Sequence, residues 1–191
     1  MSFLVALAIG TVCGVIMSRK SIWALPVRVY VEFFRGTPLL VQIFFIYYGL
    51  PQVGLVLNEW VAAVLALGLN SGAYIAEIVR GALAGIDRGQ TDAAHALGFT
   101  WVQALIWVVI PQALRTATPP LVNAISSLLK DTSLLSVIAI TEIMYVANEV
   151  YSKTFRAFEI YAVVAAIYFV MTFAFSMLSR VLEHRLGLAT A

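Results

Sequence analysis

Long stretches without a charged side chain are the feature that most limits what this sequence can fold into. Uncharged runs cover residues 36–58, 60–76, 116–129 and 160–179. Only 12% of the 191 residues are charged, against roughly 25% in an average soluble protein, so a water-facing surface could not be covered. Because about 20 apolar residues in a helix cross the hydrocarbon core of a bilayer, we predict an integral membrane protein.

A further apolar run, residues 3–17, precedes these four. It is shorter than the roughly 20 residues that a span needs, so either its neighbours complete it or the chain starts later than its relatives do. Strands of a membrane barrel would be segments of about 10 residues with alternating polarity, and no such alternation occurs in the sequence. We therefore expect an all-α membrane protein: a single transmembrane domain with five transmembrane helices at about residues 1–18, 36–57, 59–80, 111–131 and 160–181.

The lysines and arginines predict the orientation. Nine of the twelve fall in loops on one side: Arg19, Lys20, Arg28, Arg35, Arg80, Arg88, Arg115, Arg180 and Arg185. Lys153 and Arg156 fall on the other side, in an outer loop expected at about residues 142–159, and Lys130 lies in or beside the fourth span. Cytoplasmic loops carry the excess of Lys and Arg. This predicts a multi-pass protein of the bacterial cytoplasmic (inner) membrane, with its N-terminus outside and its C-terminus in the cytoplasm.

Two cytoplasmic segments are more than simple loops. Residues 21–35 place apolar side chains at helical spacing opposite charged ones, which predicts an amphipathic helix in the membrane interface. Thr37 is expected to cap the helix that follows, with Pro38 at its first position.

The second such segment is the loop at residues 81–110. It contains small residues and a helix break at Gly98. We expect Thr91 or Asp92 to cap a short helix at residues 93–97, Gly98 to end it, and Pro111 to interrupt a second helix at residues 101–110. Such a surface could receive another protein, but an ordinary loop packed on its own subunit fits the composition equally well.

The spacing inside this loop resembles a signature of the permease subunits of ABC importers. The chain has Asp92-Ala93-Ala94, then Gly98, then Val108, Ile110 and Pro111, at the distances of the family's Glu-Ala-Ala, Gly and Ile-x-Leu-Pro. Motifs at residues 34–38, 80–82, 89–90, 111–115 and 129–134 resemble the polar amino-acid branch, of the histidine/glutamine permease type. The resemblance runs from about Gly10 to Leu186.

This resemblance implies a type I ABC importer permease fold with a cytoplasmic coupling helix that docks on a separate ATPase. The residues expected at that contact are Gly89, Asp92, Ala93, Ala94, Leu97 and Gly98. The implied partners are two copies of an ATP-binding subunit, a second permease copy or a homologous permease, an extracytoplasmic substrate-binding protein, the lipid bilayer and a polar amino-acid substrate. The sequence has no Gly-x-x-x-x-Gly-Lys-Ser/Thr loop, so ATP and Mg are expected on the partner. The chain itself should be no enzyme and hold no cofactor.

Polar side chains inside the spans suggest a substrate pathway, because such groups are costly in lipid and usually face a cavity or another helix. Helical spacing places them on one face of the third span and one face of the fourth: Asn70, Tyr74 and Glu77, then Asn123, Ser126, Ser127 and Lys130, followed by Asp131 and Thr132. Lys130 could meet a substrate carboxylate and Asp131 an ammonium group. Alternatively, these groups bond only across helices, Lys130 pairs with Asp131, and Glu77 pairs with Arg80.

Two other functions fit less well. A secondary amino-acid transporter would be expected to show paired inverted repeats, into which five spans do not divide. An intramembrane enzyme would need a nucleophile and base or a metal set in its spans, but the sequence has one cysteine, Cys13, and its histidines His95 and His184 fall outside the spans. We expect no metal site and no nucleic-acid partner.

Overall fold

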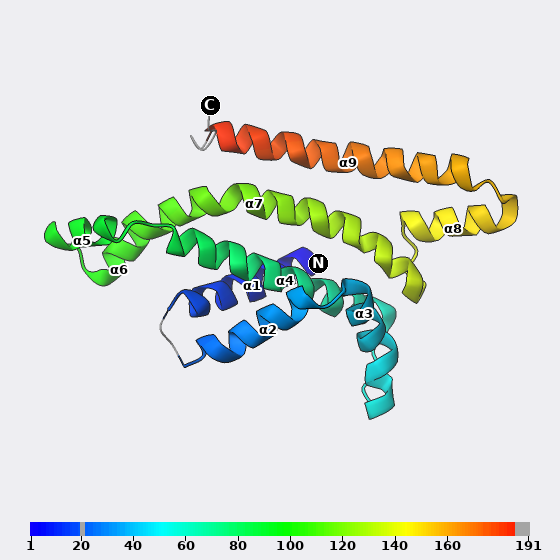
Figure 1. Cartoon of the computed structure of the whole chain (residues 1–191), viewed down its shortest axis with the longest axis horizontal. Coiled ribbons are helices and arrows are strands. Elements are labelled where there is room, and N and C mark those ends of the chain that lie inside the picture. The colour runs from blue at the N-terminus through cyan, green and yellow to red at the C-terminus, as the bar shows by residue number, and fades with distance from the viewer. Residues whose placement is uncertain (20–21, 186–191) are drawn as a thin grey trace.

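The computed structural model describes residues 1–19 and 22–185 and is built from helices, with no strand in those two segments (Figure 1). The α-helices are α1 (Ser2–Ser18), α2 (Ala24–Gly36), α3 (Leu39–Phe44), α4 (Glu59–Ala84), α5 (Arg88–Ala96), α6 (Trp101–Ala104), α7 (Ile110–Asp131), α8 (Ile143–Thr154) and α9 (Ala157–Arg185). Short π-helical segments follow α3 (Phe45–Gly49) and α6 (Leu105–Val109), and 3-10 segments cover Leu50–Val53 and Thr132–Ile138. In Figure 1, α7 lies between α4 and α9, and α1 and α2 lie against the other side of α4.

Three helices of the described chain are long and apolar enough to cross a membrane: Glu59–Ala84, the continuous run Trp101–Ile138, and Ala157–Arg185. Helix α1 is apolar but shorter, and α2 meets the run Leu39–Val53 at a bend of 106°. The span expected at residues 36–57 corresponds to the second of these two segments, and the bend falls at its expected start. Thr37 and Pro38 are extended, which fits the bias of a residue before proline away from helix, and this breaks the segment.

Thr37 does not cap α3 as expected. The N-cap of α3 is Pro38, with no side-chain capping bond. The Thr37 hydroxyl instead donates backward to the carbonyl of Phe33, at 2.8 Å. The Thr37 hydroxyl therefore bonds to the last turn of α2 and does not cap the N-terminus of α3.

Helices α1 and α4 approach closely through small residues. A Cβ added to Gly10 would lie 2.5 Å from Cγ2 of Ile75, and one added to Gly14 would lie 2.6 Å from the carbonyl oxygen of Ala76. Glycines four apart allow such contact between helices in membranes. This face makes α1 and α4 one packed unit.

Helix α2 runs along α4 and forms a second small core. Val31 is buried with Met17 and Ala73, and the Tyr30 hydroxyl donates to the carbonyl of Leu69 at 2.7 Å. An amphipathic helix in the membrane interface was expected at residues 21–35; the helix observed from Ala24 instead packs along α4, and its last turn contacts Asn70 near the middle of α4. Of the residues assigned to the cytoplasmic side and to this helix, Lys20 and Ser21 lie outside the described residues.

The helix expected at residues 93–97 starts earlier. It is α5, which begins at Arg88 and is capped by Asp87, whose carboxylate accepts the Gly89 N–H at 2.6 Å. The expected caps at Thr91 or Asp92 are therefore wrong, and both residues lie inside α5. Gly98 does adopt the left-handed conformation expected of it, with φ +84°.

Pro111 does not interrupt the next helix. The chain is helical from Trp101 through Ile138, and Pro111 falls in the first turn of α7. The π-helical segment just before it widens the hydrogen-bond pattern, and this wider turn accommodates a residue that has no N–H to donate.

The outer loop expected at residues 142–159 contains a helix, α8. The Glu142 carboxylate caps it by accepting the N–H groups of Met144 and Tyr145, at 2.8 and 2.5 Å. Phe155 is left-handed at φ 55° and ends the helix, so that α9 can start at Ala157.

Candidate functional site

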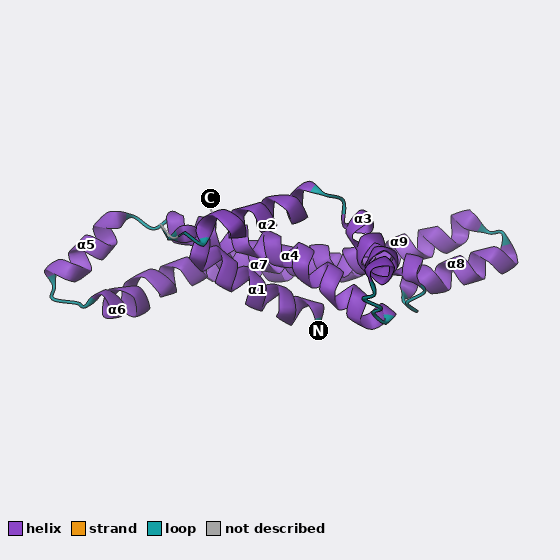
Figure 2. Ribbon diagram, turned by 90° about the horizontal axis from the view of Figure 1, so that it is seen from below, coloured by secondary structure: helices purple, strands orange, loops and turns teal. Residues whose placement is uncertain are grey.

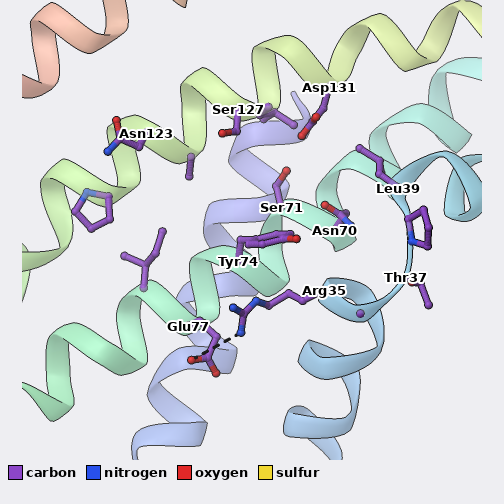
Figure 3. A pocket seen from close by; sticks show the side chains of 16 residues that line it. Arg35, Thr37, Leu39, Asn70, Ser71, Tyr74, Glu77, Asn123, Ser127 and Asp131 are labelled. Carbon is purple, nitrogen blue, oxygen red and sulfur yellow. Dashed lines mark ion pairs between the residues drawn. The ribbon is translucent and has the colours of Figure 1, made fainter.

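A cavity of about 840 Å³ lies among the α2–α3 bend, α4 and α7 (Figure 3). It is open on one side and is lined by both polar and apolar groups. Its lining residues are Arg35, Gly36, Thr37, Pro38, Leu39, Asn70, Ser71, Tyr74, Glu77, Ile78, Pro120, Asn123, Ala124, Ser127, Leu128 and Asp131. The elements that build it are the broken helix and the two long helices that flank it.

The structure brings six of the nine residues of the expected substrate pathway to this cavity: Asn70, Tyr74, Glu77, Asn123, Ser127 and Asp131. The other three, Ser126, Lys130 and Thr132, do not line it. On α7 the lining residues share one broad face of the helix, and Lys130, at the edge of that face, is not among them. The Thr132 hydroxyl donates to the carbonyl of Leu129.

Arg35 is a charged cavity residue that was not among the residues expected in the substrate pathway. Its guanidinium carbon lies 5.3 Å from the ring centre of Tyr74, and its Nη1 lies 4.0 Å from Oε2 of Glu77. In the sequence Arg35 counts as one more cytoplasmic cation before a turn. The signal that could have found it is the Thr37-Pro38 break, because the last turn of the helix that ends there lines the cavity.

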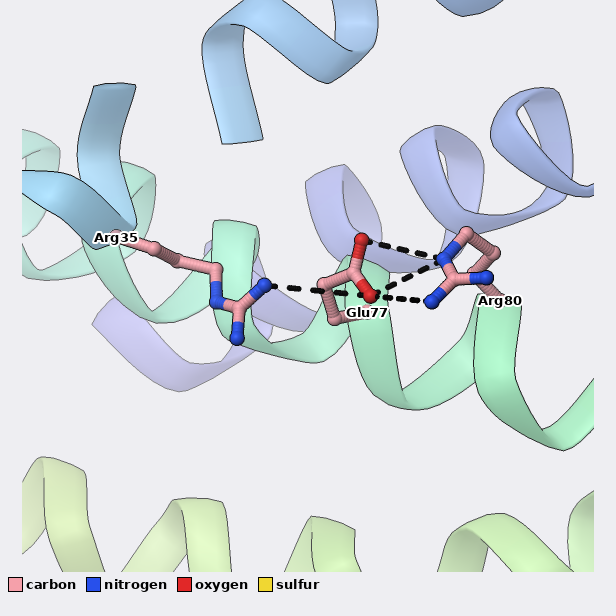
Figure 4. A network of polar contacts seen from close by, with 3 residues as sticks. All are labelled: Arg35, Glu77 and Arg80. Atoms are coloured by element: carbon pink, nitrogen blue, oxygen red, sulfur yellow. Dashed lines mark hydrogen bonds and ion pairs between the residues drawn. The ribbon is translucent and has the colours of Figure 1, made fainter. Parts of the chain in front are cut away.

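Glu77 is already paired within its own helix. Its carboxylate accepts Nη2 of Arg80 at 2.7 Å and Nε of Arg80 at 3.0 and 3.2 Å (Figure 4). This agrees with the alternative interpretation of Glu77. Because the contact from Arg35 is long by comparison, Arg35 keeps most of its donors for another partner.

Asn70 also serves a contact within the protein. Its Nδ2 donates to the carbonyl of Phe34 at 3.0 Å and to Oε1 of Gln42 at 3.1 Å. An amide nitrogen has two hydrogens, so both are used and only Oδ1 remains for a ligand.

Charges of both signs therefore face the cavity from different elements. Arg35 comes from the end of α2, and Asp131 from the end of α7; Figure 3 shows Tyr74, Ser71 and Asn70 between them. A cation, an anion and neutral hydrogen-bonding groups around one cavity suit a small zwitterion. Within residues 1–19 and 22–185 no group of three or more His, Cys, Asp or Glu side chains is arranged to hold a metal ion.

A second candidate site is the loop of α5 and α6, which projects at one end of the molecule, opposite α8 (Figure 2). Of the residues expected to contact an ATPase, Gly89, Asp92, Ala93, Leu97 and Gly98 are exposed, and Leu97 is 79% exposed. Ala94 is buried at 4%. Ala94 therefore packs inside the loop, and the free surface is made by its neighbours.

The base of this loop contacts the end of α1. The Arg19 guanidinium carbon lies 5.1 Å from the ring centre of Trp101, at the first position of α6. Thr100 and Gln103 cap α6 reciprocally, at 2.8 and 3.3 Å. The loop is therefore fixed at α6 by the contact between Arg19 and Trp101 and by the reciprocal cap of Thr100 and Gln103.

An all-helical membrane chain with a polar cavity among its helices has the architecture of a transport subunit, and comparison with known proteins agrees. Residues 6–188 match the family described as binding-protein-dependent transport system inner membrane component. The chain belongs to this family and is a membrane-spanning permease subunit.

Relatives of known name fall in the same class. The chain is 42% identical over 160 residues to a glutamine transport system permease protein of Escherichia coli, covering 83% of this chain and 73% of the relative. It is 42% identical over 170 residues to a probable amino-acid ABC transporter permease of Vibrio harveyi, covering 85% and 76%.

Solved structures give the same fold. An amino acid ABC transporter crystallised with histidines is 41% identical, with a TM-score of 0.86 over 96% of this chain and 88% of that one. An inward-facing methionine ABC transporter is 20% identical with a TM-score of 0.70, over 95% and 89%, and this likeness concerns the fold alone.

Proposed function

We propose that this chain is the permease subunit of an ATP-driven ABC importer that moves polar amino acids across the cytoplasmic membrane. The observation that carries the proposal is the cavity with Arg35 on one side and Asp131 on the other. Arg35 replaces Lys130 as the group for the substrate carboxylate, because a guanidinium binds carboxylates through paired hydrogen bonds. Relatives named as glutamine and amino-acid permeases support this substrate class.

The energy comes from a partner that docks on α5. The exposed face of α5, with Asp92, Ala93 and Leu97, meets a groove on an ATP-binding subunit, which holds ATP and Mg. A full transporter contains two such ATPases, this permease with a second copy or a homologous permease, and an extracytoplasmic substrate-binding protein. The membership in a binding-protein-dependent family supports these partners.

The chain crosses the membrane five times in this proposal. The crossings are α1, the broken pair Ala24–Gly36 and Leu39–Val53, α4, the helix that contains α7, and α9. The N-terminus is outside and the C-terminus is in the cytoplasm. Support comes from the nine lysines and arginines in the loops expected on the cytoplasmic side and from the broken helix pair, which passes as one span by length and composition.

The test is transport by the reconstituted complex. The permease, its ATPase and its binding protein are placed in liposomes, and ATP hydrolysis and uptake are measured for each common amino acid. We expect one or a few polar amino acids to stimulate both. Uptake that proceeds without ATP hydrolysis and follows an ion gradient would favour a secondary transporter and overturn the proposal.

The coupling role has its own test. Ala93→Glu places a charge on the exposed face of α5 and should abolish ATP-driven uptake while the protein still inserts. Ala84→Glu, at an exposed alanine at the end of α4, is the matched control and should retain uptake. Equal uptake in the two variants would exclude docking through this face.

A further inference from the structure

The bend between α2 and α3 places the end of a helix beside the middle of α4, which is long and apolar enough to cross a membrane. Helix α2 ends at Gly36, and Asn70, near the middle of α4, contacts its last turn. The last four carbonyl groups of a helix have no partner within the helix. In lipid an unpaired carbonyl is costly, and irregular backbone is tolerated only where protein or a wet cavity satisfies it. The bend therefore needs donors from elsewhere in the chain.

Two buried side-chain amides supply them. Nε2 of Gln42 lies 2.8 Å from the Phe34 carbonyl, 3.1 Å from the Thr37 carbonyl and 2.7 Å from Oγ1 of Thr37. Nδ2 of Asn70 donates to the same Phe34 carbonyl and to Oε1 of Gln42, at 3.0 and 3.1 Å. Gln42 is 5% exposed and Asn70 6%. The two amides thus join α2, α3 and α4 at one carbonyl oxygen.

That carbonyl belongs to the residue before Arg35. Arg35, Gly36, Thr37 and Pro38 all line the cavity, whereas Gln42 does not. Figure 3 shows Arg35 extending from the bend toward Tyr74 and Glu77 on α4. Any shift of the Phe34 carbonyl would carry the Arg35 backbone with it and move the guanidinium relative to the Tyr74 ring.

We propose that the Gln42–Asn70 amide pair is a positioning device that fixes the broken helix and thereby sets where Arg35 presents its guanidinium to the substrate. Gln42 acts through Arg35 without touching the cavity. Asn70 does both, since its Oδ1 remains free for a ligand. This inference rests on the proposed function of the cavity, but the geometry of the bend can be tested without any substrate.

The first experiment reports on the bend alone. Cys13→Ala removes the one native thiol, and Gly36→Cys adds a probe where a new side chain meets no atom within 4 Å. The rate of its reaction with a water-soluble methanethiosulfonate is measured with Gln42→Leu and, as matched control, with Gln52→Leu, an exposed glutamine of the same broken span. Loss of a buried amide should change the rate roughly fivefold or more, and the control should not change it. Equal rates in the Cys13→Ala/Gly36→Cys parent and in its Gln42→Leu and Gln52→Leu derivatives would overturn the proposal.

The second experiment asks whether the bend sets substrate binding. In liposomes, Gln42→Leu should raise the substrate concentration for half-maximal uptake roughly tenfold, with a smaller effect on the maximal rate. Asn70→Leu should do the same, and the double variant should be no worse than the more severe single variant, because the two amides act as one unit. An unchanged half-saturation in Gln42→Leu, or strictly additive effects, would contradict the proposal.

If Gln42→Leu does not insert into the membrane, a milder variant can be tested in its place. Gln42→Asn keeps the amide but shortens the side chain by one methylene, and it should move both readouts in the same direction by less. The absence of any shift in Gln42→Asn together with a normal protein level would count against the proposal. If the wild-type complex carries no amino acid while the thiol rates differ as expected, the proposed function fails and the role of the amide pair in the bend stands.

Discussion

At the scale of single residues, some polar side chains of the cavity are bonded to other protein groups, and others keep donors or acceptors free for a ligand. Glu77 is held by Arg80, and the amide hydrogens of Asn70 are both donated within the protein. Arg35 has only a long contact with Glu77 and a stacked position over Tyr74. Because a cation over an aromatic ring keeps its N–H groups free at the edge, Arg35 is the group best prepared for a carboxylate.

Arg35→Leu should reduce uptake at low substrate concentration by more than tenfold, because a charge-assisted pair is lost. Arg35→Lys should restore only part of it, since an ammonium lacks the planar fork of donors. Uptake and binding-protein-stimulated ATP hydrolysis measure both effects.

Arg28→Leu is the control, since Arg28 lies on the same helix but does not line this cavity. Equal losses in Arg28→Leu and Arg35→Leu would mean that the cytoplasmic positive charge matters in general, and that the cavity position of Arg35 does not.

At the scale of elements, the stability of the protein should depend on the close packing of α1 on α4. Gly14→Leu forces a side chain against the Ala76 carbonyl and Val79, and overpacking of this kind costs about 1–3 kcal/mol. We expect a lower Tm of the detergent-solubilised protein. Gly81→Leu, where an added Cβ meets nothing within 4 Å, should leave Tm unchanged; a drop of the same size in both variants would contradict the packing argument.

The start of α5 offers a second test at this scale. Asp87→Ala removes the cap and should cost about 1 kcal/mol of helix stability, which loosens the element proposed to receive the force from the ATPase. We expect severalfold less uptake per ATP hydrolysed. Asp87→Ser, which keeps a capping oxygen, should restore most of the coupling. If Asp87→Ala transports with normal stoichiometry, a rigid α5 is not required.

At the scale of the whole molecule, the two ends differ. The α5–α6 loop occupies one end and α8 the other (Figure 2), and Arg19 lies with Trp101 at the α5 end. None of the central apolar window of α9 is buried within the chain. Lipid or a second permease subunit must therefore cover α9 in the membrane.

The orientation follows as a prediction for the whole chain. In a Cys13→Ala background, Ser152→Cys in α8 should react with a membrane-impermeant thiol reagent added to intact cells. Ala96→Cys in α5 should react only after the membrane is opened. Both positions are exposed, so access depends on the side of the membrane alone. The opposite pattern would place α5 outside, where no ATPase could reach it.

Local patterns in the sequence were enough to predict that this is a membrane protein and where several of its helices lie. Uncharged runs of span length predict where apolar helices lie, because the bilayer imposes a length on them. The left-handed Gly98 and the motif around it could be recognised, since a helix end and its small residues are contiguous in the chain.

Caps and breaks were harder to predict than the helices themselves. Asp87, Thr91 and Asp92 are all competent capping residues, so residue type alone could not choose Asp87. A helix start at Thr37-Pro38 could be predicted from the residue types, but the 106° bend between α2 and α3 could not. Composition records that a segment is apolar, and it does not record how two neighbouring helices are oriented.

What the sequence by itself determined is thus the class of protein, its long apolar helices and its family. Only the tertiary structure decided that Arg35 faces the cavity, that Lys130 does not, and that Gln42 and Asn70 meet at the Phe34 carbonyl. The reason is physical: apolar length and turn residues act locally along the chain. A buried polar contact instead depends on which side chains three separate helices bring to the same point.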